Sequence, residues 1–309
     1  MLKPAAALQK TVKASIPCTG VGLHTGVKTT MTLLPAAEGT GIVFRRIDGP
    51  VPIEIPALWN NAIESALCTT LRDTRGNSIM TIEHLMAALS GCGIDNVIVE
   101  LDGPEVPIMD GSAEPFVFLI ECAGIAVQTA PRLAIKVLKT VSVGDGLKSA
   151  SLEADHVFAV DMDIDFPNRI IAQQSTSLVL DPMVFKEEVS RARTFGFLNE
   201  VDQMRAAGLA RGGSLENAIV VSGDVVLNKD GLRYVDEFVR HKALDAIGDL
   251  YLAGGPILGR FRGVRSSHAL NRRLLEALFA DRDAWCYAHV TEAADFSQPW
   301  EQPLEALSA

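Results

Sequence analysis

The chain has 309 residues, 48% of them hydrophobic and 21% charged, which is the profile of a globular protein with one large core or two ordinary ones. No apolar run approaches the ~20 residues that cross a bilayer, and residues 1–9 lack the apolar stretch of a secretory signal. The net charge of −10 argues against a nucleic-acid partner. Five cysteines without C-x-x-C spacing indicate a reducing compartment, so we expect a cytoplasmic protein without an integral membrane segment.

The first half of the chain alternates strand-like segments with turns before its first helix. Strand-like runs lie at 29–34 and 41–44. Apolar residues at helical spacing predict a helix over about 82–90, and a glycine-flanked turn then leads into a strand at 96–101. Residues 115–123 are expected to form a closing helix.

The second half repeats this order. Strand-like runs at 134–137 and 157–160 precede a helix expected at about 236–253. A strand at 256–261 and a helix at about 270–280 follow it. The repeated order of strands, helix, glycine turn, strand and helix indicates duplication of one α+β unit.

We therefore predict an α+β fold of two similar domains, residues 1–129 and 130–309. The second half has additional sequence, with a helix-like stretch at 182–193 and an apolar insert at about 194–222. Inserts on a duplicated scaffold are where specificity is commonly built.

The helix at about 236–253 carries a row of polar residues. His241 and Asp245 are four residues apart, so they lie one turn apart on one face, and Asp249 extends the row by another turn. Apolar residues gather on roughly the opposite face. This is the pattern of a helix that packs on one side and borders a cleft on the other.

The helix at about 82–90 places His84 away from its apolar face, beside the small residues Ala87 and Ala88. A lone histidine in such a position is usually solvated or hydrogen-bonded. His/Asp pairs spaced by four also occur as ordinary surface contacts. Neither helix by itself therefore indicates a metal site.

Taken together, the two helices supply the residues of a catalytic zinc site. Such a site keeps three protein ligands and one open position, and His84, His241 and Asp245 provide two imidazoles and a carboxylate. Glu83 could act as the general base without binding the metal. Without the metal set beside it, Glu83 would be interpreted as a solvated glutamate in the first turn of a helix.

His268 follows a predicted strand and precedes a helix, so it is a candidate acid. A protonated imidazole there could donate to a leaving amine, and Asp249 could hold it in the charged form. The alternative is that His268 only caps the following helix. Among the cysteines, Cys68 is the one we place near a site, and we expect the other four to be small buried apolar residues.

Several sequence motifs, which follow one another in the same order as in a known family, give the chain a family resemblance over about residues 10–300. The chain resembles the UDP-3-O-acyl-N-acetylglucosamine deacetylases, zinc amidases that commit a nucleotide sugar to lipid A synthesis in Gram-negative bacteria. The matching motifs are Gly20-Val21-Gly22-Leu23-His24-Thr25-Gly26, Thr81-Ile82-Glu83-His84-Leu85, Pro107-Ile108-Met109-Asp110-Gly111-Ser112, Ser190-Arg191-Ala192-Arg193-Thr194-Phe195-Gly196, Phe238-Val239-Arg240-His241-Lys242-Ala243-Leu244-Asp245 and Ser267-His268-Ala269-Leu270-Asn271.

The resemblance implies a role for each matching residue. The zinc ligands would be His84, His241 and Asp245, with Glu83 as the base. His268 would be the second acid/base group and Asp249 the carboxylate that orients it. Thr194 would help to hold the oxyanion, and Lys242 would contact the nucleotide sugar. Phe195 and the insert at about 194–222 would form the wall of an acyl passage. We also expect Cys68, Leu23 and His24 to bind substrate.

The resemblance implies two sheets with helices sandwiched between them, an insert in each domain, and one zinc ion per chain, with iron as an alternative in the cell. The implied reaction removes the N-acetyl group of UDP-3-O-(3-hydroxyacyl)-N-acetylglucosamine, and we expect a monomer. The alternatives are a zinc amidohydrolase of another acylated substrate and a catalytically silent nucleotide-sugar or lipid-binding module. Ala210 and Ala66 depart from some relatives, and these departures bear on the width of the passage and the mouth of the site.

Overall fold

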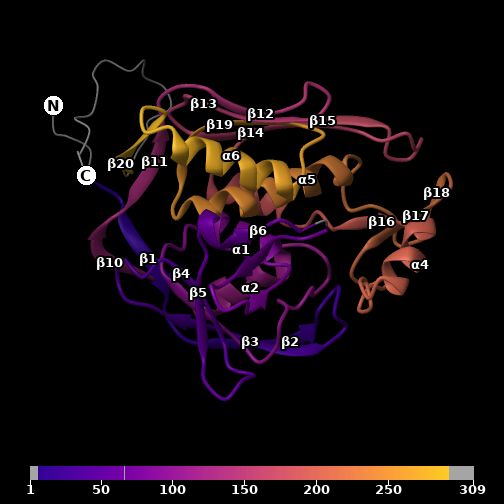
Figure 1. The fold of residues 1–309 in the computed structure, drawn as a ribbon, viewed down its shortest axis with the longest axis horizontal. Helices are drawn as coiled ribbons and strands as arrows, with labels where there is room; N and C mark the ends of the chain where they lie inside the picture. Colours follow the sequence, from indigo (N-terminus) through magenta and orange to yellow (C-terminus); the bar gives the residue numbers. More distant parts are fainter. Residues whose placement is uncertain (1–5, 66, 292–309) are drawn as a thin grey trace.

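The protein is described by a computed structural model over residues 6–65 and 67–291 (Figure 1). Ala66, one of the two departures, and the outermost residues of both expected domains lie outside this range. Within it, no helix is long and apolar enough to cross a membrane. The chain combines several sheets with helices, which is compatible with the α+β class expected from the sequence.

The first large sheet has five strands in the order β2-β3-β9-β4-β5. These are β2 (Ile16–Val21), β3 (Lys28–Pro35), β9 (Val97–Leu101), β4 (Ile42–Arg46) and β5 (Ile53–Pro56). The β4–β9 pair is parallel and the other three pairs are antiparallel. Helix α1 (Glu83–Cys92) precedes the central strand β9, and α2 (Glu114–Ala123) follows it.

The second large sheet has seven strands, five of which run in the order β12-β13-β19-β14-β15. They are β12 (Val141–Gly144), β13 (Ser149–Glu153), β19 (Ile257–Val264), β14 (Phe158–Asp165) and β15 (Gln173–Val179). The β14–β19 pair is parallel and the other three are antiparallel. Helix α5 (Glu237–Leu250) precedes β19 and α6 (His268–Ala280) follows it. Strand β11 (Leu133–Val137) extends the sheet from β19 to β20 (Trp285–His289).

Three smaller sheets contain the other strands of the described residues. Strands β1 (Leu8–Val12) and β10 (Ile125–Pro131) pair with each other. One three-stranded sheet contains β6 (Ala62–Ile63), β7 (Thr70–Arg72) and β8 (Ser78–Ile79). The other contains β16 (Phe195–Phe197), β17 (Ile219–Ser222) and β18 (Val225–Val226), and with α4 (Leu198–Ala206) it projects from one side of the molecule (Figure 1).

The helices form a central layer. In Figure 1, α1, α2, α5 and α6 lie between the sheet that contains β2 and β3 and the sheet that contains β12 to β15. Helices α1 and α5 approach each other closely at Gly248, where a Cβ atom would lie 2.0 Å from the carbonyl oxygen of Glu83. One apolar cluster runs from Val12 to Ala284 through both large sheets and the helices between them.

Most of the expected elements overlap an observed helix or strand, but the stretch at 182–193 does not form one helix. It contains a single α-helical turn, α3 (Pro182–Val184), followed by a π-helical turn, η2 (Phe185–Val189). The N–H of Ser190 reaches back five residues to the carbonyl of Phe185. The N–H of Arg193 donates instead to the carboxylate of Glu237 at 3.0 Å, so the segment leaves the helix to reach α5.

Two further expectations need adjustment. The helix expected to run to residue 253 ends as α5 at Leu250 and continues as a 3-10 turn, η3 (Tyr251–Ala253). All five cysteines are free, as expected, but only Cys92 of the four assigned to the interior is buried. Cys122 is exposed, because it lies on the outer face of α2, and Cys18 and Cys286 are half-buried.

Candidate active site

Three side chains with ligand atoms converge from the two central helices. His84 comes from the first turn of α1, and His241 and Asp245 lie one turn apart on α5. The Nε2 atoms of His84 and His241 lie 3.6 Å and 3.3 Å from Oδ1 of Asp245. One ligand atom from each residue lies within 4.8 Å of the other two, and all three residues are buried. The spacing suits a single ion between them.

The protonation of His241 and Asp245 suits a zinc ion. Nδ1 of His241 donates to the carbonyl of Ala192 at 3.0 Å, so its Nε2 atom carries the free lone pair. Burial lowers the pKa of His241 to about 4, which leaves the ring neutral. Burial alone would raise the pKa of Asp245, but His241 and Lys242 together hold it well below its usual range. Neutral imidazoles and a carboxylate are the donor set that zinc binds.

Glu83 is buried beside the three candidate ligands. Its Oε2 atom accepts a hydrogen bond from the backbone N–H of Thr69 at 3.0 Å. Its Oε1 atom faces Nε2 of His268 at 3.8 Å. Burial raises the pKa of Glu83 to about 7, although the charge of His268 opposes the shift. A carboxylate with such a pKa can accept and release a proton near neutral pH.

His268 is the first residue of α6, but the helix is capped by Ser267, whose hydroxyl accepts the N–H of Leu270 at 3.4 Å. The interpretation of His268 as a simple cap is therefore wrong. Its Nδ1 atom donates to Oδ2 of Asp249 at 2.8 Å. Burial opposes ionisation of His268, yet the nearby Asp249 carboxylate raises its pKa to about 10. A charged His268 carries a proton on Nε2, the atom that faces Glu83.

Two partners of Asp249 were not singled out from the sequence. Thr69 donates its hydroxyl to Oδ1 at 2.5 Å, and the Asn271 amide donates to Oδ2 at 2.8 Å. Asn271 follows His268 by three residues on one helix, a spacing that could have identified it. Thr69 is separated from Asp249 by 180 residues, and no local pattern indicates their contact.

A largely apolar cavity of about 320 Å³ adjoins this group. Leu23, His24, Thr194 and Phe195 line it, as does Ala210, together with the insert residues Leu198, Val201, Met204, Leu215, Ala218, Val220 and Leu227. The ring of Phe195 packs edge-on against that of His241, with 6.2 Å between centroids, so the cavity begins beside the candidate metal ligands. The structure thus brings the predicted passage residues and the predicted catalytic residues into one site.

The loop that carries Leu23 and His24 is fixed by a buried carboxylate. Glu105 accepts hydrogen bonds from the backbone N–H groups of His24 and Thr25, each at 2.8 Å. The hydroxyls of Thr25 and Thr81 donate to it as well. Within the described part of the chain, neither ring nitrogen of the buried His24 has a hydrogen-bond partner. The imidazole of His24 thus lies at the cavity wall with no hydrogen bond from the described residues.

Lys242 and Cys68 lie at the edges of the site. The ammonium of Lys242 donates to Oδ2 of Asp245 at 2.7 Å, so it pairs with a candidate ligand. Cys68 lines a small cavity together with Thr69, Asp249 and His268. Both residues thus border the candidate catalytic groups.

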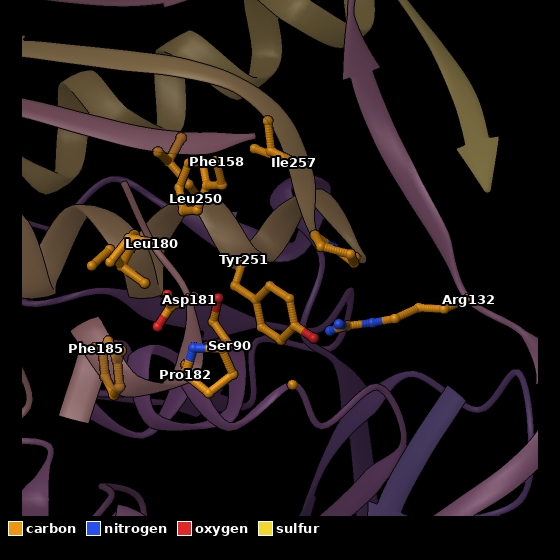
Figure 2. A pocket seen from close by; sticks show the side chains of 15 residues that line it. Ser90, Arg132, Phe158, Leu180, Asp181, Pro182, Phe185, Leu250, Tyr251 and Ile257 are labelled. Carbon is orange, nitrogen blue, oxygen red and sulfur yellow. The ribbon is translucent and has the colours of Figure 1, made fainter. Parts of the chain in front are cut away.

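A separate cavity of about 140 Å³ lies near the far ends of α1 and α5 (Figure 2). Ser90, Leu250 and Tyr251 line it, and Figure 2 shows the hydroxyl end of Tyr251 turned toward Arg132. That hydroxyl donates to the carbonyl of Ile94 at 2.9 Å. None of the site residues predicted from the sequence lines this cavity, so it is not part of the candidate active site.

Two imidazoles and a carboxylate, flanked by a second carboxylate and a His–Asp pair, are an arrangement typical of metal-assisted hydrolases. The family model for UDP-3-O-acyl N-acetylglycosamine deacetylase matches residues 9–280. A Shewanella sp. (strain W3-18-1) protein named UDP-3-O-acyl-N-acetylglucosamine deacetylase is 48% identical over 303 residues, covering 97% of this chain and 99% of the relative. Proteins of the same name from Shewanella frigidimarina and Shewanella oneidensis are each 49% identical over 289 residues, covering 93% of this chain and 94% of the relative. The chain belongs to this deacetylase family.

Proposed function

We propose that this chain is a zinc-dependent deacetylase of lipid A biosynthesis. It would hydrolyse the N-acetyl group of UDP-3-O-(3-hydroxyacyl)-N-acetylglucosamine to give UDP-3-O-(3-hydroxyacyl)-glucosamine and acetate. The observation that carries the proposal is the buried group of His84, His241 and Asp245, with Glu83 and His268 beside it. The apolar cavity and the names of the relatives support an acylated UDP-sugar as the substrate.

Zinc is the proposed cofactor, with iron as an alternative in the cell, and when bound it would polarise the amide carbonyl and acidify water toward a pKa of ~7. Glu83 would take the proton of the attacking water at Oε1, because its Oε2 atom is already held by the N–H of Thr69. The raised pKa of Glu83 suits this transfer.

The second proton transfer falls to His268. Breaking the amide bond requires a proton on the leaving nitrogen, and His268 would donate it from Nε2. Its contact with Asp249 through Nδ1 keeps the ring charged and oriented. The hydroxyl of Thr194, in the wall of the adjoining cavity, would donate to the developing oxyanion.

Substrate binding is proposed to use both ends of the site. The acyl chain would occupy the cavity lined by Leu23, His24 and Phe195, where burial of each methylene is worth ~0.8 kcal/mol. Lys242 would contact the nucleotide sugar, and Cys68 would lie near the mouth. Ala210 lines this cavity, so its departure from some relatives bears on the width of the passage.

We also propose that the two halves arose by duplication, as domains 1–129 and 130–309. The two large sheets support this, because β2-β3-β9-β4-β5 and β12-β13-β19-β14-β15 have one parallel pair each, at the same place in the order. A helix precedes and another follows the central strand in both. The small sheets β6-β7-β8 and β16-β17-β18 would be the two inserts.

We further propose that the protein is cytoplasmic and monomeric.

The proposal is tested by measuring acetate release from UDP-3-O-(3-hydroxyacyl)-N-acetylglucosamine and from UDP-N-acetylglucosamine, which lacks the acyl chain. We expect acetate from the acylated substrate, loss of activity on chelation and recovery with zinc. The unacylated substrate should give a kcat/KM more than about 100-fold lower, because it cannot fill the cavity. Equal rates would favour a different amidohydrolase, and binding of the substrate without turnover would favour a silent binding module.

A further inference from the structure

Thr69 contacts three of the candidate catalytic groups at once. It lies immediately before β7 and is only 7% exposed. Its backbone N–H donates to Oε2 of Glu83 at 3.0 Å. Its hydroxyl oxygen lies 2.5 Å from Oδ1 of Asp249 and 3.1 Å from Nδ1 of His268. One residue therefore joins the proposed base to the proposed acid pair.

The direction of each hydrogen bond follows from the atoms involved. A threonine hydroxyl has one proton, and the carboxylate of Asp249 can only accept it. The oxygen of Thr69 is then an acceptor toward the N–H of His268, which it shares with Oδ2 of Asp249 at 2.8 Å. The hydroxyl thus closes a small ring of hydrogen bonds around the His268–Asp249 pair.

Each contact is made to the atom of Glu83 or His268 that does not take part in the proposed proton transfer. Glu83 is held at Oε2, which leaves Oε1 free, and His268 is held at Nδ1, which leaves Nε2 free. The two free atoms face each other across 3.8 Å. Thr69 comes from the first half of the chain, whereas Asp249 and His268 come from the second, so it fixes one half's base against the other half's acid.

We propose that Thr69 is a positioning residue that sets the geometry between the proton acceptor Glu83 and the proton donor His268. The inference rests on the proposed deacetylase function. Thr69 acts through the two residues it holds, and it does not itself transfer a proton. The neighbouring Thr70 is equally buried but contacts only the thiol of Cys68, at 3.6 Å, among the interactions described for its hydroxyl, so it is a matched control.

The test compares Thr69→Val, Thr69→Ser and Thr70→Val in the zinc-loaded full chain. Valine keeps the shape and the backbone N–H but removes the hydroxyl. We expect Thr69→Val to lower kcat by about 10–100-fold, as is usual when a supporting hydrogen bond is removed, with KM and zinc content unchanged. Thr69→Ser should restore most of the rate, and Thr70→Val should match the wild type. If the valine variant does not fold, Thr69→Ala is measured in its place with the same expectation.

A double-mutant cycle separates positioning from general stability. If Thr69 acts through His268, Thr69→Val should have little further effect on kcat in a His268→Ala background. A full additional loss there would overturn the inference, as would a single Thr69→Val variant with wild-type kcat. An inactive wild-type protein would instead contradict the proposed deacetylase function, so the two failures are distinguishable.

Discussion

Glu83 and His268 are two ionisable residues whose side chains border the candidate metal ligands without belonging to that group. Their free atoms, Oε1 and Nε2, are 3.8 Å apart, close enough for both to reach one tetrahedral centre. Their pKa values are shifted in the same direction but with different consequences. Burial leaves Glu83 near a pKa of 7 and thus able to accept a proton, whereas Asp249 keeps His268 protonated despite its burial.

We predict that Glu83→Ala and His268→Ala each lower turnover by ~10²–10⁴-fold, the usual contribution of a general acid or base. Zinc content should stay at the wild-type level, since neither side chain is among the three candidate ligands. Steady-state kinetics and metal analysis on the same samples check both statements. Glu121→Ala, which removes a surface partner of Lys186, is the control and should leave turnover unchanged. Near-normal turnover of either test variant would remove that residue from the mechanism.

Sequence spacing could predict the part of the site that lies within one element. His241 and Asp245 are one helical turn apart, so their common face follows from the period of the helix. The contact of His84 with Asp245 joins two helices that are far apart in the chain. Sequence spacing alone could therefore only suggest that His84 belongs to the same site. Thr69 was not predicted as a site residue, because its contacts with Asp249 and His268 arise only when the two halves pack together.

At the scale of elements, the site depends on how closely α1 and α5 approach. The absence of a side chain at Gly248 lets α5 lie against the first turn of α1, where Glu83 and His84 are located. A buried ion pair also holds the first residue of α5 in place. Glu237 binds Arg193 through the side chain at 2.9 Å and through the backbone, next to Thr194 and Phe195. Both contacts position site residues without touching the cavity.

We predict that Gly248→Ala destabilises the protein and lowers turnover. Alanine normally stabilises a helix by about 1 kcal/mol relative to glycine. Here its Cβ would lie 2.0 Å from the Glu83 carbonyl and 3.1 Å from the Ala87 nitrogen, so the helices must separate, at a cost of about 1–3 kcal/mol. Thermal unfolding and kcat measure the two effects. Gly49→Ala, whose Cβ would meet only the Val51 carbonyl at 3.8 Å, is the control. A more stable, fully active Gly248→Ala protein would contradict the close approach.

The stretch at 182–193 does not form the single helix that its local sequence predicts. Its composition favours one helix, and Asp181 does cap the start with hydrogen bonds to the N–H groups of Met183 and Val184. The α-helical turn passes into a π-helical turn at Phe185, and beyond it the N–H of Arg193 is taken by Glu237, 44 residues away. A tertiary contact of this kind leaves no periodic signal in the sequence.

At the scale of the molecule, the candidate ligands come from both halves. The repeated order of elements, which was visible in the sequence, places α1 before β9 and α5 before β19. The layered packing then sets these two helices against each other between the large sheets (Figure 1). The order of elements could be predicted from the residue pattern, whereas the packing of α1 against α5 was implied only by the family resemblance, because it depends on the fit between distant parts of the chain, as at Gly248.

We expect one zinc ion to join the two halves of the chain through His84, His241 and Asp245. Anomalous diffraction at the zinc edge, from crystals of the zinc-loaded wild-type protein, tests it most directly. We predict one anomalous peak per chain in this site, at bonding distance of about 2.0–2.2 Å from Nε2 of His84, Nε2 of His241 and the carboxylate of Asp245. A peak bound elsewhere, or one that lacks His84 from the first half, would show that no zinc ion is shared between the two halves.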